Sequence, residues 1–259
     1  MLLSDLHTHT HYSFDSEEPG EHSCEAAIAQ GLTAIAITNH CDYDCILSGI
    51  YPSYDFEADR REIVMLREKY SGKLRVLYGI EAGQPQLYPA ALKQMIETYS
   101  FEYVLGSIHN LKDVPDFAFL NFTEMPQRQI ESLFQRYLTE YDQMVNCPGI
   151  TAAAHLTYPL RYIHHYGREL ELEPFYPQIE EIFRDMIRNG VMLEINTSGL
   201  RQGLGCTMPD SELVALYYAC GGRAVTIGSD AHRACDIGAG ISETAEMLKK
   251  IGFTQIGIL

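Results

Sequence analysis

The sequence lacks any long apolar stretch, and no window of about 18 residues is apolar enough to span a membrane. Its first residues enter an alternating, strand-like pattern without a basic or continuously apolar start, so we expect no leader segment. These absences argue against a membrane span and a secretion signal. We therefore expect a soluble, cytoplasmic protein.

Basic residues are scarce in this 259-residue chain. There are 19 Lys and Arg against 35 Asp and Glu, the formal net charge is −16, and the basic residues form no run. The electric field of this negative charge repels polyanions, so we expect neither nucleic acid nor a membrane among the partners. A metal centre offsets negative charge locally, which leaves a small anionic substrate compatible with the composition. The sequence carries no signal for the oligomeric state.

Cysteine patterns typical of a disulfide framework are also missing. The seven cysteines are odd in number and irregularly spaced, as expected for free thiols in a reducing compartment. Cys41 and Cys45 are the only close pair, and no second pair completes a thiolate zinc site. We predict that both are buried thiols and assign no chemistry to them.

Apolar or β-branched segments recur along the chain, with helical patterns between them. The predicted strands are residues 3–9, 33–38, 74–80, 103–108, 150–154, 191–195 and 224–228, and the predicted helices are 21–30, 56–70, 88–99, 126–145, 173–189, 209–220 and 243–251. Alternating β and α units predict a parallel sheet with right-handed crossovers, and their even spacing favours a closed barrel. We expect residues 1–259 to form one α/β domain, a seven-stranded TIM-like barrel. The segment 255–258 is a possible eighth strand that the sequence leaves undecided.

Three irregular segments follow strand ends, at residues 41–55, 111–125 and 158–172. They are rich in Tyr, Pro, Asp and His. Active-site loops of such barrels follow the C-terminal ends of the strands. We expect these segments to be substrate-binding loops.

Metal-binding side chains stand at or just after the predicted strand ends. Residues 5–9 read Asp-Leu-His-Thr-His, so His7 and His9 leave the same face of one strand. The remaining donors follow strand by strand and are His40, Glu81, His109, His155, Asp230 and His232. A single histidine at a strand end is more often a packed residue than a ligand, but this convergence on one rim favours ligands. Nitrogen and oxygen donors without thiolates suit zinc, iron or manganese, so the pattern predicts a polynuclear metal site.

Six segments, in chain order, resemble the motifs of the PHP (polymerase and histidinol phosphatase) family. They are DLHTHTHYSFD (5–15), AIAITNHCDYD (34–44), GIEAG (79–83), GSIHN (106–110), AAAH (152–155) and IGSDAH (227–232). Within that family the chain is similar to the monofunctional histidinol-phosphate phosphatases. That similarity rests on SFDS after the H-x-H, on HCDYD, and on DIGAGI at 236–241.

The resemblance implies a distorted seven-stranded (β/α)7 barrel with three divalent metal ions, whether zinc, iron or manganese. It assigns His7, His9, Glu81 and Asp230 to the first ion, Glu81, His109 and His155 to the second, and Asp15, His40 and His232 to the third. Some members have histidine where Asp15 stands. The pattern before His40 is commonly Thr-Asp-His, and Asn39 occupies its middle position here. The ligand set is intact, but residue 39 supplies no carboxylate partner for His40.

Arg161 in YPLRY (158–162) and Arg201 in NTSGLR (196–201) follow strand ends. A planar guanidinium binds phosphate through two N–H groups, and a solvated loop arginine is the ordinary alternative. The resemblance implies that both arginines hold the substrate phosphate. Ser198 is predicted to donate to phosphate oxygens. Asp42 is predicted to contact a cationic part of the substrate or to supply a proton, and a solvated loop acid is an equally good interpretation.

These features predict metal-dependent hydrolysis of a small phosphate monoester, with L-histidinol phosphate as the expected substrate and a metal-bridging hydroxide as the nucleophile. The predicted catalytic residues are Glu81, Asp230, Asp42, Arg161 and Arg201. An exonuclease of the same family is disfavoured by the acidic composition. Amidohydrolase-type barrels often bridge their metals with a carboxylated lysine, where Glu81 stands here. A regulatory domain without turnover would be expected to have lost metal donors.

Overall fold

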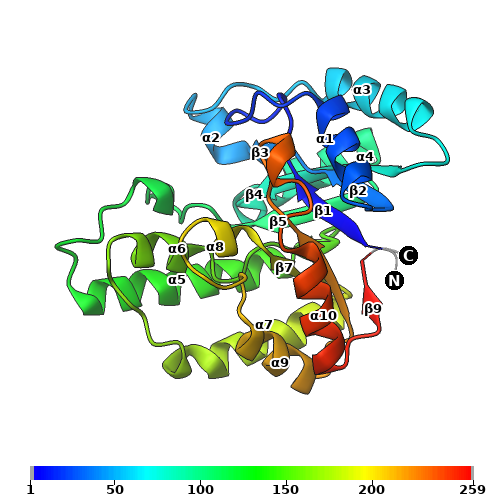
Figure 1. Ribbon diagram of the computed structural model, residues 1–259. Helices are drawn as coiled ribbons and strands as arrows, with labels where there is room; N and C mark the ends of the chain where they lie inside the picture. The colour runs from blue at the N-terminus through cyan, green and yellow to red at the C-terminus, as the bar shows by residue number, and fades with distance from the viewer. Residues whose placement is uncertain (1–2, 258–259) are drawn as a thin grey trace.

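The computed structural model describes residues 3–257 and arranges their strands in one parallel sheet (Figure 1). The strand order is β1-β2-β4-β5-β6-β7-β8-β9, and β3 pairs with the C-terminal part of β4. The strands are β1 (Ser4–Thr8), β2 (Ala34–Ile37), β3 (His40–Asp42), β4 (Arg75–Gly83), β5 (Tyr103–Ser107), β6 (Ala152–Ala153), β7 (Met192–Asn196), β8 (Ala224–Gly228) and β9 (Gln255–Ile256). Every pairing between these strands is parallel, as the alternating β and α segments predicted.

Helices follow most strands. They are α1 (Gly20–Ala29), α2 (Tyr43–Leu47), α3 (Phe56–Lys69), α4 (Pro89–Tyr99), α5 (Gln127–Val145), α6 (Tyr158–His165), α7 (Tyr176–Asn189), α8 (Ser198–Arg201), α9 (Ser211–Ala219) and α10 (Ile241–Ile251). Local signals set several boundaries: Asp55 caps α3 by accepting from Ala58 N, and α7 ends at Gly190 with φ 71°. Within residues 3–257, no helix combines the length and apolar content that a membrane span requires.

The sheet separates two apolar layers. A large core lies between the strands and the helices, while a smaller cluster that includes Leu6, Leu77 and Leu105 fills the opposite face. Leu77 and Glu81 are four residues apart on β4 and therefore lie on the same face. The small apolar cluster thus lies below the C-terminal end of the strands, where the polar side chains begin.

The first and eighth strands meet through backbone and side-chain hydrogen bonds. His9 N donates to Ala231 O at 2.8 Å, and Asp230 N donates to His7 O at 2.8 Å. Nearer the other end, the buried Asp5 carboxylate accepts from Ser229 N at 2.8 Å and from Gly238 N at 2.9 Å. The sheet therefore curves until β1 and β8 lie side by side, and we call this contact the seam.

Three details differ from the sequence prediction. The seven expected strands are present, but residues 40–42 form an additional strand, β3, because β4 extends far enough to pair with them. The undecided segment 255–258 contains β9 over Gln255–Ile256, and its last residue lies outside the described part. The segment 158–172, expected to be a loop, begins with α6, because Pro159 in the first turn starts a helix.

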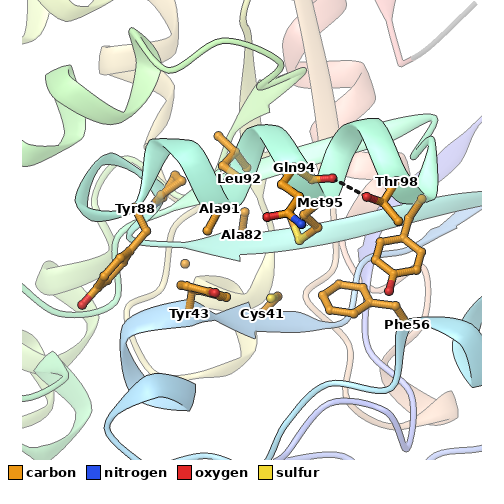
Figure 2. Close-up of a pocket in the computed structure, with 13 residues that line it drawn as sticks. Cys41, Tyr43, Phe56, Ala82, Tyr88, Ala91, Leu92, Gln94, Met95 and Thr98 are labelled. Carbon is orange, nitrogen blue, oxygen red and sulfur yellow. Dashed lines mark hydrogen bonds between the residues drawn. The ribbon is translucent and has the colours of Figure 1, made fainter.

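Cys41 and Cys45 are buried free thiols, as predicted. Cys41 lines a pocket of about 250 Å³ between β3 and α4, with Tyr88 and Met95 on its opposite side (Figure 2). Neither thiol belongs to a metal-capable group among the described residues. Successive side chains of a strand point to opposite faces, so His40 and Asp42 face away from this pocket.

Candidate metal centre

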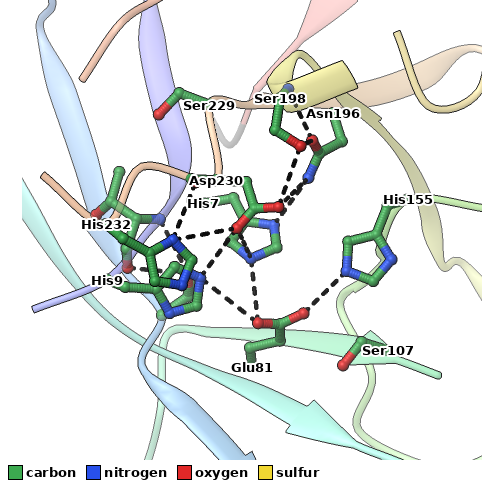
Figure 3. A network of polar contacts seen from close by, with 12 residues as sticks. His7, His9, Glu81, Ser107, His155, Asn196, Ser198, Ser229, Asp230 and His232 are labelled. Carbon is green, nitrogen blue, oxygen red and sulfur yellow. Dashed lines mark hydrogen bonds and ion pairs between the residues drawn. The ribbon is translucent and has the colours of Figure 1, made fainter. Parts of the chain in front are cut away.

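The predicted metal donors converge at the C-terminal ends of the strands (Figure 3). Three sets of donor atoms each lie within 4.8 Å of one another: His7, His9 and Asp230; Glu81, His109 and His155; and His9, His40 and His232. A fourth set within the same limit is His40, Asp42 and His109, so the sets overlap. The donors come from segments that are far apart in the sequence, and the parallel sheet brings them to one rim.

Glu81 on β4 lies at the centre of the cluster and is completely buried. Its Oε2 lies 3.2 Å from His7 Nε2 and 2.9 Å from His40 Nδ1. Its Oε1 lies 3.0 Å from His109 Nε2 and 3.1 Å from His155 Nε2. A carboxylate that faces different imidazoles with its two oxygens has the geometry of a bridging ligand.

Asp15 lies at the outer side of the cluster and is partly exposed. Its Oδ2 lies 3.0 Å from His232 Nε2 and 3.6 Å from His40 Nε2. Burial opposes ionisation of Asp15, but His40 and His232 outweigh it and hold the pKa of Asp15 well below its usual range. The structure thus brings Asp15 to the two histidines with which the sequence analysis grouped it.

Electrostatics divides the histidines into two kinds. Burial disfavours a charge on His7, His40 and His109, but neighbouring carboxylates outweigh it and raise the pKa of each well above its ordinary value. The leading carboxylate is Glu194 for His7, Glu81 for His40 and Asp42 for His109. Burial and nearby imidazoles hold the pKa of His9 well below its ordinary value, and burial also lowers the pKa of His155. The carboxylates therefore attract positive charge to a largely buried site.

The donor atoms fit divalent cations. His7, His9 and His232 each bury an Nε2 atom without a hydrogen-bond partner, as His40 does with Nδ1 and Glu81 with Oε2. Buried polar atoms without partners are rare in folded proteins. Several of them directed into one cluster of nitrogen and oxygen donors match the coordination of zinc, iron or manganese.

Glu194 on β7 supports the cluster and was missed by the sequence analysis, which found no donor at the end of this strand. Its Oε1 lies 2.7 Å from His7 Nδ1, and its Oε2 accepts from His155 N at 2.9 Å. The signal that the sequence offers is an acidic residue within the apolar run 191–195. A second carboxylate therefore orients one donor imidazole and the backbone of another.

Two glycines allow this close approach. A Cβ on Gly228 would lie 2.3 Å from the Cβ of His7 and 2.5 Å from Oε1 of Glu194. A Cβ on Gly83 would lie 2.1 Å from Oδ1 of Asp42. Any larger residue at either position would displace a side chain that supports the donors.

Asp42 is placed differently from its expected substrate contact. It is 2% exposed, does not line the cavity beside the metal cluster, and its Oδ1 lies 2.8 Å from His109 Nδ1. Ser198 is also fully buried, and its hydroxyl donates to Asn196 Oδ1 at 2.6 Å and lies 3.3 Å from Asp230 Oδ2. Both side chains contact donor or supporting residues, within the wall of the site.

A cavity of about 490 Å³ opens beside the cluster and is lined by both predicted arginines. Arg161 on α6 packs over the rings of Tyr158 and Tyr162 at 4.9 and 4.8 Å, and its Nη1 lies 3.9 Å from Asp230 Oδ2. Arg201 at the end of α8 donates from Nη2 to Asp230 O at 2.9 Å, while its buried Nη1 has no partner. Two guanidinium groups therefore border the space next to the metal donors.

Backbone strain is present at two of the donors. His155 has φ 28° and Asp230 has φ 54°, in the left-handed region that residues other than glycine rarely adopt. Such conformations cost about 1–3 kcal/mol each and persist where the surrounding structure fixes them. Here the backbone hydrogen bonds from His155 N to Glu194 and from Asp230 N to His7 O hold them in place.

Comparisons with known proteins agree with this geometry. The model of the PHP domain family matches residues 5–198. The chain is similar to the histidinol-phosphatase of Lactococcus lactis subsp. lactis (29% identity, covering 99% of this chain and 94% of that protein). It is also similar to the probable histidinol-phosphatase of Thermotoga maritima (29% identity, covering 99% and 95%).

Solved structures show the same fold. The histidinol phosphate phosphatase of Lactococcus lactis, crystallised with zinc, L-histidinol and phosphate, superposes with a TM-score of 0.82 at 25% identity, covering 98% of this chain and 95% of that one. A putative histidinol phosphatase of Listeria monocytogenes superposes with a TM-score of 0.81 at 19% identity, covering 93% and 99%. With the family model matching most of its length, this chain belongs to the PHP domain family.

Proposed function

We propose that this protein is a metal-dependent phosphatase that hydrolyses L-histidinol phosphate to L-histidinol and phosphate. The observation that carries the proposal is the convergence of nine nitrogen and oxygen donors beside a cavity bordered by Arg161 and Arg201. The similar proteins named histidinol-phosphatase, one of them crystallised with L-histidinol and phosphate, support the choice of substrate. We infer that the whole chain acts as one PHP domain on a distorted (β/α)7 barrel built from β1, β2 and β4–β8.

We propose that the site holds three divalent ions. His7, His9, Glu81 and Asp230 would hold the first, Glu81, His109 and His155 the second, and Asp15, His40 and His232 the third. Glu81 would bridge the first two, since its two oxygens face different imidazoles. Divalent ions in such a site make hydroxide available near neutral pH and neutralise charge on phosphate oxygens.

We propose that the arginines bind and orient the substrate phosphate. Arg201 Nη1 is buried at the cavity without a partner, so a phosphate oxygen would satisfy it. The rings of Tyr158 and Tyr162 and the hydroxyl of Tyr162, 2.5 Å from Nη2, hold the Arg161 guanidinium in one orientation. A preoriented guanidinium loses little conformational entropy when it forms two bonds to phosphate.

We propose supporting roles for Asp42 and Ser198. Asp42 would fix the orientation of His109, because its carboxylate accepts from Nδ1 and leaves Nε2 toward Glu81. Ser198 would orient Asn196 and the Asp230 carboxylate, with Arg161 Nη1 donating to its hydroxyl at 3.4 Å. The fully buried positions of these residues favour these roles over direct contact with the substrate.

Phosphate release from purified, metal-analysed protein tests the proposal. The substrates are L-histidinol phosphate, several other small phosphate monoesters and one phosphodiester. We expect release that depends on bound metal and is fastest with L-histidinol phosphate, and we expect Glu81→Gln to lose both metal and turnover. Faster cleavage of the diester, or equal release by metal-free protein, would contradict the proposal.

A further inference from the structure

A buried chain of hydrogen bonds joins the donor His9 to helix α3. His9 Nδ1 lies 3.0 Å from Ser13 Oγ, which lies 3.1 Å from Asn39 Oδ1. Asn39 Nδ2 in turn lies 3.3 Å from Asp59 Oδ1. All four residues are at most 3% exposed, and Ser13, Asn39 and Asp59 are not among the metal donors assigned above. This hydrogen-bond network therefore lies behind the metal site, and the proposed phosphate hydrolysis gives it no role.

The orientation of the Asn39 amide is determined on both sides. Thr10 N, which can only donate, lies 2.7 Å from Asn39 Oδ1. Asp59 Oδ1 faces Asn39 Nδ2, which can only donate. The Asn39 oxygen therefore points toward Thr10 and Ser13, and its NH₂ group points toward α3.

The position of each hydrogen on Ser13 follows from this orientation. Ser13 has one hydroxyl proton, and it donates this proton in the hydrogen bond to Asn39 Oδ1. His40 N donates to Ser13 Oγ at 3.0 Å, which uses one of its lone pairs. Only the second lone pair remains for His9, so His9 Nδ1 must carry the hydrogen and Nε2 must present a free lone pair.

We propose that Asn39 and Asp59 are positioning residues that fix Ser13 and thereby hold His9 in the tautomer that offers Nε2 to a metal ion. His9 Nε2 is buried without a hydrogen-bond partner and lies 3.4 Å from Asp230 Oδ1, as this role requires. Partners behind metal-binding histidines tune metal affinity by about 10–100-fold. The inference rests on the metal site of the proposed function and is independent of the substrate.

Asp59 suits this role in either protonation state. Its second oxygen, Oδ2, lies 2.5 Å from the hydroxyl of Tyr54, so a carboxyl proton has a place on that side. Oδ1 remains an acceptor for Asn39 in both cases. Without Asp59, one buried N–H of Asn39 would lose its partner, which costs about 1–3 kcal/mol and frees the amide to turn.

Zinc affinity measured by competition with a chromogenic chelator tests the coupling. Asn39→Leu removes the acceptor for Ser13, and we expect about 10–100-fold weaker binding. Asn39→Asp alone places two carboxyl groups side by side, and we expect about tenfold weaker binding. The exchange Asn39→Asp with Asp59→Asn restores a carboxyl–amide pair, and we expect affinity within about threefold of the native protein.

Glu62→Gln is the matched control, because it removes the same charge from α3 and its partners are Gly20 N and His11. We expect native zinc affinity for this variant. If the exchanged pair binds zinc no better than Asn39→Asp alone, Asp59 is not coupled to the site and the proposal fails. This comparison uses two closely similar variants and remains decisive if Asn39→Leu does not fold.

The tautomer itself is visible by ¹⁵N NMR of histidine-labelled, metal-free protein, with the His9 signals assigned by their loss in His9→Gln. We expect the Nδ1–H tautomer in the native protein and in the exchanged pair, and an increased Nε2–H population in Asn39→Leu. Identical tautomer populations in all variants would overturn the proposal. Failure to hydrolyse L-histidinol phosphate would refute the substrate assignment alone, since neither readout uses it.

Discussion

Oε1 of Glu194 lies 2.7 Å from Nδ1 of His7, and both side chains are fully buried. The second oxygen of Glu194 accepts from His155 N at 2.9 Å. One carboxylate on β7 therefore orients a donor from β1 and the backbone of a donor after β6. This contact crosses the sheet between strands that are remote in sequence.

We expect Glu194→Gln to weaken metal binding by about 10–100-fold. Both oxygens of Glu194 accept, so a glutamine in either orientation would turn its NH₂ group toward a donor. Equilibrium dialysis against a metal buffer measures the effect. Glu180→Gln is the control, because within residues 3–257 Glu180 forms its ion pair with Arg184, on the outer face of α7. Equal metal affinity of both variants would show that Glu194 does not support the site.

We expect Gly228→Ala to destabilise the fold by about 1–3 kcal/mol, as overpacking of a filled interior does. The added methyl group would lie 2.3 Å from the Cβ of His7, so β1 and β8 would have to separate. Urea unfolding gives the free energy, and metal analysis gives the accompanying loss of ions. An unchanged urea midpoint of unfolding, together with full metal content, would mean that a side chain at position 228 fits between β1 and β8.

We expect Arg201→Ala to raise KM for the phosphate ester, with a smaller change in kcat and unchanged metal content. The removed guanidinium borders the cavity, and its polar contacts within the described part of the chain are with Asp230 O and Asp236. Steady-state kinetics separates the two constants. Arg188→Ala serves as the comparison, because this arginine is exposed on α7 and does not line the cavity. A loss of ions from Arg201→Ala would assign it to the metal site.

Metal binding is expected to release protons. The pKa values of His7, His40 and His109 are raised in the metal-free protein, so these imidazoles keep their protons to higher pH than free histidine does, and an ion must displace them. Affinity should therefore rise with pH. Calorimetric titration in two buffers of different ionisation enthalpy counts the protons, and we expect about one to three. Identical heats in both buffers would contradict this prediction.

Asp59 is expected to make stability fall as pH rises. Burial raises the pKa of Asp59 from 3.8 to about 7, with Glu62 and Asp55 adding to the effect and Tyr54 and Asn39 opposing it. Between about pH 4 and 7 the folded protein keeps a proton that the unfolded chain loses, which removes about 4 kcal/mol of stability as pH rises.

Urea unfolding across this pH range measures that slope. Other acids of the site have lowered pKa values and oppose it, so the comparison is with Asp59→Asn, which lacks the titrating group. We expect the native protein to lose more stability with rising pH than this variant does. Parallel pH profiles would refute the assignment of the titration to Asp59.

The sequence was sufficient to predict the parallel strands and the gathering of the candidate donors at one rim. Each long strand is an apolar run, and period-two spacing in residues 5–9 places His7 and His9 on one face. Because parallel strands end at one rim, donors such as Glu81 could be grouped without knowing any distance. Recurrent local patterns therefore predicted the parallel architecture and which side chains lie together at the strand ends.

Features that depend on neighbouring strands were not predictable. β3 is three residues long and exists because β4 continues beside it, which no local pattern reveals. In the sequence, Glu194 is a single acidic residue within an apolar strand. Only the folded sheet places its carboxylate beside His7. Asp42 follows His40 in sequence, yet its shorter contact is with His109, 67 residues away, at 2.8 Å. Supporting contacts of this kind arise from tertiary packing, so sequence spacing alone does not reveal them.

The seam between β1 and β8 has a consequence for assembly of the protein. Asp5 on β1 is in contact there with Ser229, which lies 224 residues later and follows β8. The donor set of His7, His9 and Asp230 also combines residues from β1 and from the segment after β8. During synthesis the chain would expose Glu81, His109 and His155 long before Asp230 and His232 leave the ribosome. We therefore expect full metal loading of the proposed site to come late in synthesis, and we expect a nascent or truncated chain to bind fewer ions.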